Sequence, residues 1–330
     1  MTTRRERALG ALVGLAVGDA LGMPTQGLSP EHIRGGVGRV TGLLPAPPDH
    51  PIAAGLPAGS VTDDTEQALL LADLLIETGG RVDPGPLAVR LADWERRMRE
   101  RGSLDLLGPS TRKAVRAVLD GVPPELAGTS GTTNGAAMRI TPVGIAVAPD
   151  DLGALVDRVE EACLVSHATS VAIAGAAAVA AAVSAGVDGH PVPVAVPLAI
   201  RAAHDGAGRG TWVAGADVGA RIAWVLQLTA AREPEPAVTD LVALIGTSLA
   251  TQESVPAAFG VLALHPDDPW AACCEAAGLG GDTDTIAAMA GAIGGAVHGP
   301  AAFPADAVAT VLAVNGLDLE RRADALLALR

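Results

Sequence analysis

The stretch TDDTEQALLLADLL (residues 62–75) and its counterpart GGDTDTIAAMAGAIGG (residues 280–295) decide how this chain is interpreted. Each begins with aspartates beside threonines and continues as a long apolar run typical of a buried helix. Carboxylate and hydroxyl oxygens are the ligands that hard divalent cations such as Mg²⁺ and Mn²⁺ prefer. Two such clusters, brought together from distant parts of the chain, would form a cage for these ions. We therefore expect a metal-dependent enzyme.

Helix capping is the alternative role for these clusters. Asp63 can serve as an N-cap with Glu66 as its capping-box partner, and Asp282 can cap the second helix. A cap needs only one side chain, however, and crowding four carboxylates together is unfavourable unless cations neutralise them. This excess of oxygen ligands favours a metal site. Its candidate members are Thr62, Asp63, Asp64, Asp282, Asp284 and Thr285.

Apolar residues elsewhere in the chain recur at helical spacing, for example over residues 152–164 and 317–330. The alternation of period two that predicts strands is hard to find. Its best candidate, residues 192–200, is interrupted by Pro193 and Pro197. We expect an all-α protein. Because the acidic clusters lie near opposite ends of the chain and must meet, we also expect a single domain over residues 1–330.

The composition limits the partners of the protein. The 330 residues are 49% hydrophobic and carry a formal net charge of −14, which argues against nucleic acid and anionic membranes as partners. The sequence has no C-x-x-C motif, and its three cysteines fit buried thiols in a reducing cytoplasm. The uncharged, alanine-rich run over residues 168–187 approaches the length of a membrane span, but we expect a helix buried in the protein.

Three further motifs are candidates for the same site. In GLAVGDALGMPTQ (residues 14–26), glycines every four residues allow close backbone approach, and Gln26 would reach into the site. In the loop 128–142, Asn134 and Gly135 suit unusual backbone dihedrals and a cradle for ribose or phosphate oxygens, although an ordinary turn fits as well. His167, before an apolar helix, can donate to a substrate oxygen or be purely structural.

Taken in order, GLAVGDALG, TDDT, NGAAMR, SHAT and GGDTDTIAAMAGA resemble the ADP-ribosylglycohydrolase family, the relatives of dinitrogenase-reductase-activating glycohydrolase. The resemblance covers residues 8–300. It implies a compact, single-domain, orthogonal multi-helix fold with a binuclear Mg²⁺ or Mn²⁺ centre at the bottom of a cleft. By motif position it implies metal ligands at Thr62, Asp63, Asp64, Asp282, Asp284 and Thr285, and substrate contacts at Asn134, Gly135 and His167.

The activity implied by the resemblance is hydrolysis of an N-glycosidic bond at ribose C1′. The substrate would be an ADP-ribosyl conjugate, including an ADP-ribosylated protein. We expect Asp63 or Asp64 to orient the attacking water. Family members usually carry a glutamate where this chain has Gln26, whose amide can hydrogen-bond a ribose hydroxyl but cannot act as an acid or base.

Departures from the family pattern keep other functions open. Thr133 replaces the usual glycine before Asn134, and a chain without tyrosine lacks the aromatic that typically stacks on adenine. Together with Gln26, these differences favour a smaller nucleoside or nucleotide as substrate. They also leave open a pseudoenzyme that binds ADP-ribose without turnover. A two-metal phosphatase has weaker support, with Arg139 as its one candidate phosphoryl contact.

Overall fold

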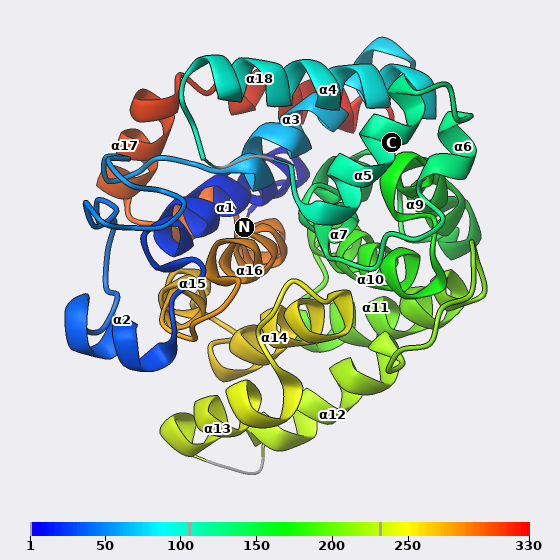
Figure 1. Cartoon of the computed structure of the whole chain (residues 1–330). Helices are drawn as coiled ribbons and strands as arrows, with labels where there is room; N and C mark the ends of the chain where they lie inside the picture. Colours follow the sequence, from blue (N-terminus) through cyan, green and yellow to red (C-terminus); the bar gives the residue numbers. More distant parts are fainter. Residues whose placement is uncertain (1, 105–106, 231–232) are drawn as a thin grey trace.

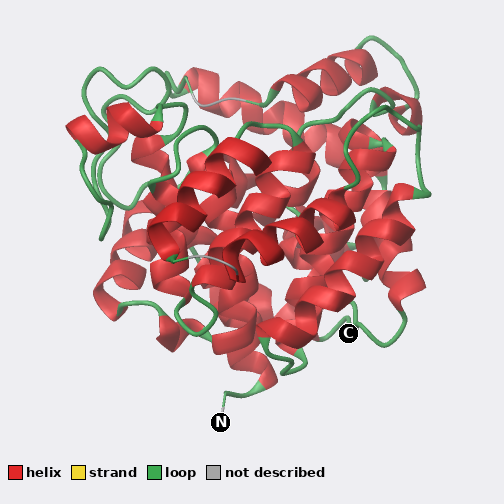
Figure 2. Ribbon diagram, turned by 90° about the horizontal axis from the view of Figure 1, so that it is seen from below, coloured by secondary structure: helices red, strands yellow, loops and turns green. Residues whose placement is uncertain are grey.

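The computed structural model describes residues 2–104, 107–230 and 233–330, and over this part the protein is built from helices (Figure 2). Extended pairing within the described residues is limited to two isolated bridges, Thr133 with Ala250 and Thr169 with Thr211. The all-α prediction is therefore confirmed. The best strand candidate, residues 192–200, lies within a helix that accommodates Pro197.

The longer helices are α1 (Arg4–Gly22), α3 (Asp63–Glu77), α4 (Pro84–Glu100), α5 (Pro109–Leu119), α9 (Leu152–His167), α10 (Ser170–Val187), α11 (Val192–Ala207), α12 (Val218–Ala230), α14 (Thr251–Leu264), α15 (Pro269–Ala277), α16 (Thr283–His298), α17 (Ala305–Asn315) and α18 (Leu319–Leu327). The shorter elements are η1 (Met23–Thr25), α2 (Pro30–Gly36), α6 (Pro124–Ala127), α7 (Gly135–Met138), α8 (Thr141–Ala146), α13 (Pro234–Asp240), the π-helical η2 (Leu241–Ile245) and η3 (Pro300–Ala302).

The core of the protein is formed by α1, α10 and α16, which other helices surround (Figure 1). Every residue of α10 is buried, as expected for the apolar run 168–187. Both α10 and the segment Arg4–Thr25 have the length and hydropathy of a membrane span, but their apolar windows are 100% and 94% buried inside the protein. A core helix explains these two segments, because their side chains pack against protein on all sides.

Helices α1 and α16 pack against each other without intervening side chains. A Cβ atom built on Gly14 would lie 1.9 Å from the Gly291 carbonyl oxygen, and one on Gly291 would lie 2.0 Å from the Gly14 carbonyl oxygen. A Cβ on Gly22 would lie 2.4 Å from the Asp284 Cα. The close approach predicted from the glycine spacing is confirmed. It brings the end of α1 against the acidic start of α16.

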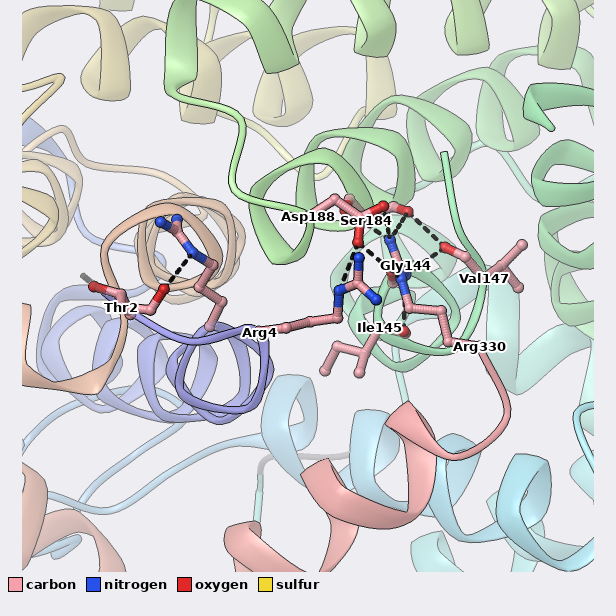
Figure 3. A network of polar contacts seen from close by, with 9 residues as sticks. Thr2, Arg4, Gly144, Ile145, Val147, Ser184, Asp188 and Arg330 are labelled. Atoms are coloured by element: carbon pink, nitrogen blue, oxygen red, sulfur yellow. Dashed lines mark hydrogen bonds and ion pairs between the residues drawn. The ribbon is translucent and has the colours of Figure 1, made fainter. Parts of the chain in front are cut away.

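The C-terminal residue Arg330 ties α18 to α8 and α10 (Figure 3). Its side chain is 4% exposed and pairs with Asp188 at 3.0 Å, which Arg4 also contacts at 3.0 Å. The guanidinium donates further hydrogen bonds to the carbonyl oxygens of Gly144, Ile145, Val147 and Ser184. These bonds hold the end of the chain against α8 and α10, at residues that do not line the cavity described below.

Candidate functional site

A cavity of about 250 Å³ lies where α3, α5, α7, α16 and the segment after η1 meet. Most of the predicted site residues line it, namely Gln26, Asp63, Asn134, Gly135, Asp282, Asp284 and Thr285. Thr62, Asp64 and His167 are buried and lie outside its lining. The fold thus brings the two acidic clusters, from opposite ends of the sequence, to a single site.

The start of α3 is held by Asp19, which is fully buried at the end of α1. Its carboxylate accepts hydrogen bonds from the backbone N–H groups of Thr62 and Thr65, both at 3.0 Å, and from their hydroxyls. The N-cap of α3 is Thr62, so the alternative in which Asp63 caps the helix is wrong. Because Thr62 and Asp19 satisfy the helix start, the Asp63 carboxylate is available to face the cavity.

The start of α16 is organised by backbone contacts. Asp282 occupies the N-cap position, but its side chain makes no capping hydrogen bond. Its carboxylate instead accepts a hydrogen bond from Asn134 Nδ2, and its backbone N–H donates to the Thr247 carbonyl at 2.8 Å. Gly281 has a φ of 77° and its N–H donates to the Leu28 carbonyl, so the turn before α16 requires glycine. Asp282 is therefore directed to the cavity.

Asp64 is the most strongly perturbed carboxyl of the cluster. Its burial, together with the neighbouring carboxylates of Asp284, Asp63, Asp19 and Asp282, raises its pKa well above 3.8. Its Oδ2 accepts long hydrogen bonds of 3.3 Å from the Thr62 and Thr285 hydroxyls. Its Oδ1 is buried and has no hydrogen-bond partner among the described residues. Burial also raises the pKa of Asp19 and Asp282 to about 6, although hydrogen bonds oppose this rise.

The chemistry of this donor set fits a hard divalent cation. The converging side chains offer oxygen atoms, one buried carboxylate oxygen of Asp64 has no hydrogen-bond partner in the described part of the chain, and a cation would relieve the repulsion among the carboxylates. Within the described residues, no three aspartate, glutamate, histidine or cysteine side chains form a ready-made metal cluster. Binding an ion would therefore require the carboxylates or threonine hydroxyls to rotate.

The segment before α7 carries two of the predicted substrate contacts. Asn134 donates from Nδ2 to Ser254 Oγ at 2.9 Å as well as to Asp282. Its φ of −75° and ψ of 1° are ordinary values, and Gly135 starts α7, so the expectation of unusual dihedrals is wrong. Glycine is needed at 135 for another reason, because a Cβ there would lie 2.9 Å from His167 Cε1.

His167 ends α9 and lies behind the wall formed by this segment. It is fully buried, with Nε2 3.0 Å from Thr133 Oγ1 and Nδ1 2.8 Å from Ser166 Oγ. Burial, reinforced by the nearby Arg139 charge, lowers the pKa of His167 well below 6.5. The imidazole is therefore neutral at physiological pH. In this arrangement His167 acts on the cavity through Thr133.

Comparison with known proteins identifies the family of this chain. The sequence model of the family described as ADP-ribosylglycohydrolase matches residues 1–330. The chain belongs to the ADP-ribosylglycohydrolase family. The uncharacterized protein YegU of Escherichia coli is 36% identical over 324 residues, which cover 98% of this chain and 97% of the relative. An uncharacterized protein of Archaeoglobus fulgidus is 35% identical over 298 residues, covering 88% of this chain and 87% of the relative.

A solved structure also resembles this member of the ADP-ribosylglycohydrolase family. One chain of a structure described as an ADP-ribosylglycohydrolase-related protein complex superposes with a TM-score of 0.75 and is 26% identical. The match covers 100% of this chain and 99% of that chain. The resemblance inferred from the five motifs is confirmed, as is the helical fold that it implied. Membership of the family indicates glycohydrolase activity.

Several residues that shape the site in this family member were not predicted as part of it. Asp19 is not among the predicted site residues, although its carboxylate accepts the hydrogen bonds that set the start of α3. Gln67 donates from Nε2 to Asp63 Oδ2 at 2.7 Å, and their i, i+4 spacing was the available signal. Arg139 is fully buried outside the cavity lining, so the structure contradicts its suggested role as a phosphoryl contact.

Proposed function

We propose that the protein is a metal-dependent hydrolase that cleaves an N-glycosidic bond at ribose C1′. One observation carries the proposal: carboxylates from the starts of α3 and α16 converge around one cavity, where burial and the neighbouring carboxylates raise the pKa of Asp64. The glycohydrolase activity indicated by the family supports this reading. The metal ligands would be Thr62, Asp63, Asp64, Asp282, Asp284 and Thr285.

Asp63 is the better candidate for the group that orients and deprotonates water. It is half-buried and lines the cavity, whereas Asp64 is 1% exposed and lies outside the lining. The hydrogen bond from Gln67 fixes one oxygen of Asp63 and leaves a carboxylate positioned as a general base. Two bound divalent cations would supply charge stabilisation and hold the ribose hydroxyls and the water.

Other cavity residues have roles suited to a riboside. Asp282 and Asp284 face the cavity from α16 and would stabilise the positive charge that develops on ribose as the bond breaks. Gln26 is 6% exposed, and its Nε2 lacks a hydrogen-bond partner among the described residues. This buried amide lines the cavity and would donate to a ribose oxygen. Asn134 would hold Asp282 and contact the same ribose.

The size and lining of the cavity favour a small N-riboside, such as a nucleoside or nucleotide. Its volume of about 250 Å³ lies below the range of roughly 300–1,000 Å³ common for drug-sized ligands, and its described lining contains no aromatic side chain. One observation favours the larger ADP-ribosyl conjugate as a second candidate. A neighbouring cavity of about 360 Å³ shares Ile52 and Leu104 with the first and offers space for a longer leaving group.

Assays of the purified protein would test this function. A panel of nucleosides, nucleotides, ADP-ribosyl-arginine and ADP-ribosylated protein would be incubated with Mg²⁺ or Mn²⁺, and the released ribose product measured. We expect turnover of one class, its loss with a chelator, and a decrease in kcat of about 10²–10⁴-fold in Asp63→Asn. Turnover that survives both changes would disprove the mechanism. Tight ligand binding without any turnover would instead indicate a binding protein.

A further inference from the structure

A chain of buried polar side chains runs behind the cavity and has Arg139 at its centre. Arg139 is fully buried in the segment that joins α7 to α8, and it does not line the cavity. Burial lowers its pKa to about 10, so the guanidinium still carries its charge at neutral pH. Its guanidinium forms no ion pair with a carboxylate of the described residues, and a buried charge without such a partner is costly, which points to a role beyond packing.

One arm of Arg139 leads to the carboxylate that faces the cavity. Its Nη1 approaches Gln67 Oε1 at 3.5 Å. The amide of Gln67 in turn donates from Nε2 to Asp63 Oδ2 at 2.7 Å. Because the guanidinium has only donors, it directs the Gln67 oxygen toward itself and the Gln67 amino group toward Asp63. Arg139 thereby determines which way the Gln67 amide points.

The other arm of Arg139 leads to Thr133, a second residue of the cavity lining. Its Nη2 donates to Ser166 Oγ at 2.5 Å, and Ser166 Oγ lies 2.8 Å from His167 Nδ1. His167 Nε2 lies 3.0 Å from the hydroxyl of Thr133, which lines the cavity. The Ser166 oxygen accepts the hydrogen bond from Arg139, so the Ser166 hydroxyl proton is available to His167 Nδ1. The neutral imidazole then carries its own proton on Nε2, which donates to the Thr133 hydroxyl.

We propose that Arg139 is a positioning residue that orients two residues of the cavity lining, Asp63 and Thr133, through two buried hydrogen-bonded arms. The role rests on the proposed function, in which Asp63 is a metal ligand and orients water. Lysine could not replace Arg139, because a single ammonium group cannot present two diverging N–H donors in one plane. Partners that orient metal ligands typically change metal affinity by 10–100-fold when they are lost.

Mn²⁺ titration of the whole protein by calorimetry, beside thermal unfolding of each variant, would test this role. We expect Arg139→Lys and Gln67→Met each to weaken Mn²⁺ binding by about tenfold or more. The double variant should be little weaker than either single variant, since both changes break the same arm. If Arg139→Lys fails to fold, Gln67→Met still tests the arm that joins Arg139 to Asp63.

Arg330→Lys is the matched control. Arg330 is also a buried arginine, but it binds backbone carbonyls away from the cavity. This variant should lower the melting temperature and leave Mn²⁺ affinity within about twofold, whereas a purely structural role for Arg139 would make the two variants alike. Unchanged Mn²⁺ affinity in folded Arg139→Lys, additive effects in the double variant, or absence of Mn²⁺ binding by the unmodified protein would overturn the proposal.

The test of the role of Arg139 can fail independently of the test of the proposed hydrolase activity. Riboside turnover by the unmodified protein is measured in a separate assay, and its failure would disprove the hydrolase. The comparison of Mn²⁺ affinities among the variants would still decide the role of Arg139. Conversely, turnover together with unchanged Mn²⁺ affinity in the variants would disprove the positioning role alone.

Discussion

At the scale of single residues, neighbouring positions of one motif have different roles. Asp63 and Asp64 are adjacent in the sequence, yet Asp63 lines the cavity and Asp64 is buried behind it. Successive residues of a helix differ by about 100° in direction, so the helix start decides which carboxylate meets a ligand. That start is set by Asp19, whose carboxylate accepts hydrogen bonds from two backbone N–H groups and two hydroxyls.

Replacing Asp19 with asparagine should destabilise the protein by about 2–4 kcal/mol at pH 7. The amide has one acceptor oxygen for the four donors of Thr62 and Thr65, and it places its own N–H₂ group against them. Urea unfolding would measure the loss. Asp318→Asn is the control, because this exposed residue caps α18 and asparagine is an equally good N-cap. Equal effects in the two variants would contradict the account.

His167 predicts a pH dependence of stability. Its pKa is lowered in the folded protein, so the stability that it contributes is complete above the unfolded pKa of about 6.5 and is lost as pH falls. Between pH 7.5 and 5.5 the free energy of unfolding should decrease by roughly 1.4 kcal/mol more in the native protein than in His167→Asn. Urea unfolding at the two pH values would measure the difference, and parallel pH profiles would contradict it.

At the scale of elements, the contact between α1 and α16 explains how distant motifs reach one site. The glycine spacing over residues 14–26 predicts close backbone approach, and this approach places Gly22 against Asp284. The helical segments were also predictable, because their apolar periodicity is strong. The exact first residues of the helices were not predictable. The cap of α3 falls on Thr62, since Asp19 reaches it from another helix, a contact that no local pattern reports.

Gly14→Ala should destabilise the protein by about 3 kcal/mol or more, because the new methyl group would collide with the Gly291 carbonyl oxygen at 1.9 Å. Gly35→Ala is the matched control. That glycine is also helical, and a Cβ there meets nothing within 4 Å. We expect it to be neutral or to stabilise by up to about 1 kcal/mol. A Gly14→Ala variant as stable as the control would disprove the tight contact.

At the scale of the whole molecule, the candidate site exists only in the folded chain. The acidic clusters were recognisable in the sequence because carboxylates and threonines form a chemically distinctive pattern. The two arms of Arg139 were not, because they join residues on α3, α9 and the segments around α7 that are far apart in sequence. Only Gln67 and Asp63 share a helical spacing, and that pair alone does not indicate a buried arginine.

Divalent cations should stabilise the native protein against heat. An ion that binds only the folded state adds about 2.7 kcal/mol at a concentration 100 times its Kd, which should raise the melting temperature by several degrees. Asp64→Asn should abolish this increase, because it removes the buried carboxylate oxygen that lacks a partner. Without metal, Asp64→Asn should be at least as stable as the native protein near pH 7, since it removes repulsion among the carboxylates.

Differential scanning fluorimetry with Mg²⁺, Mn²⁺ and a chelator would measure these shifts. A sodium salt at matched ionic strength controls for screening of surface charge, which also depends on salt. An equal increase in melting temperature with the sodium salt, or in Asp64→Asn, would contradict cation binding at this site.

The glycine contact between α1 and α16 also limits how this binding site can diversify. Helix α16 carries Asp284 and Thr285 into the cavity, and its backbone contact with α1 leaves no side chains between the two helices that could be trimmed or enlarged. New ligand preferences must therefore arise at the rim, where Leu104 and Leu249 are 65% and 46% exposed and can change size without disturbing the core. Engineering of selectivity should begin with a library at these rim positions.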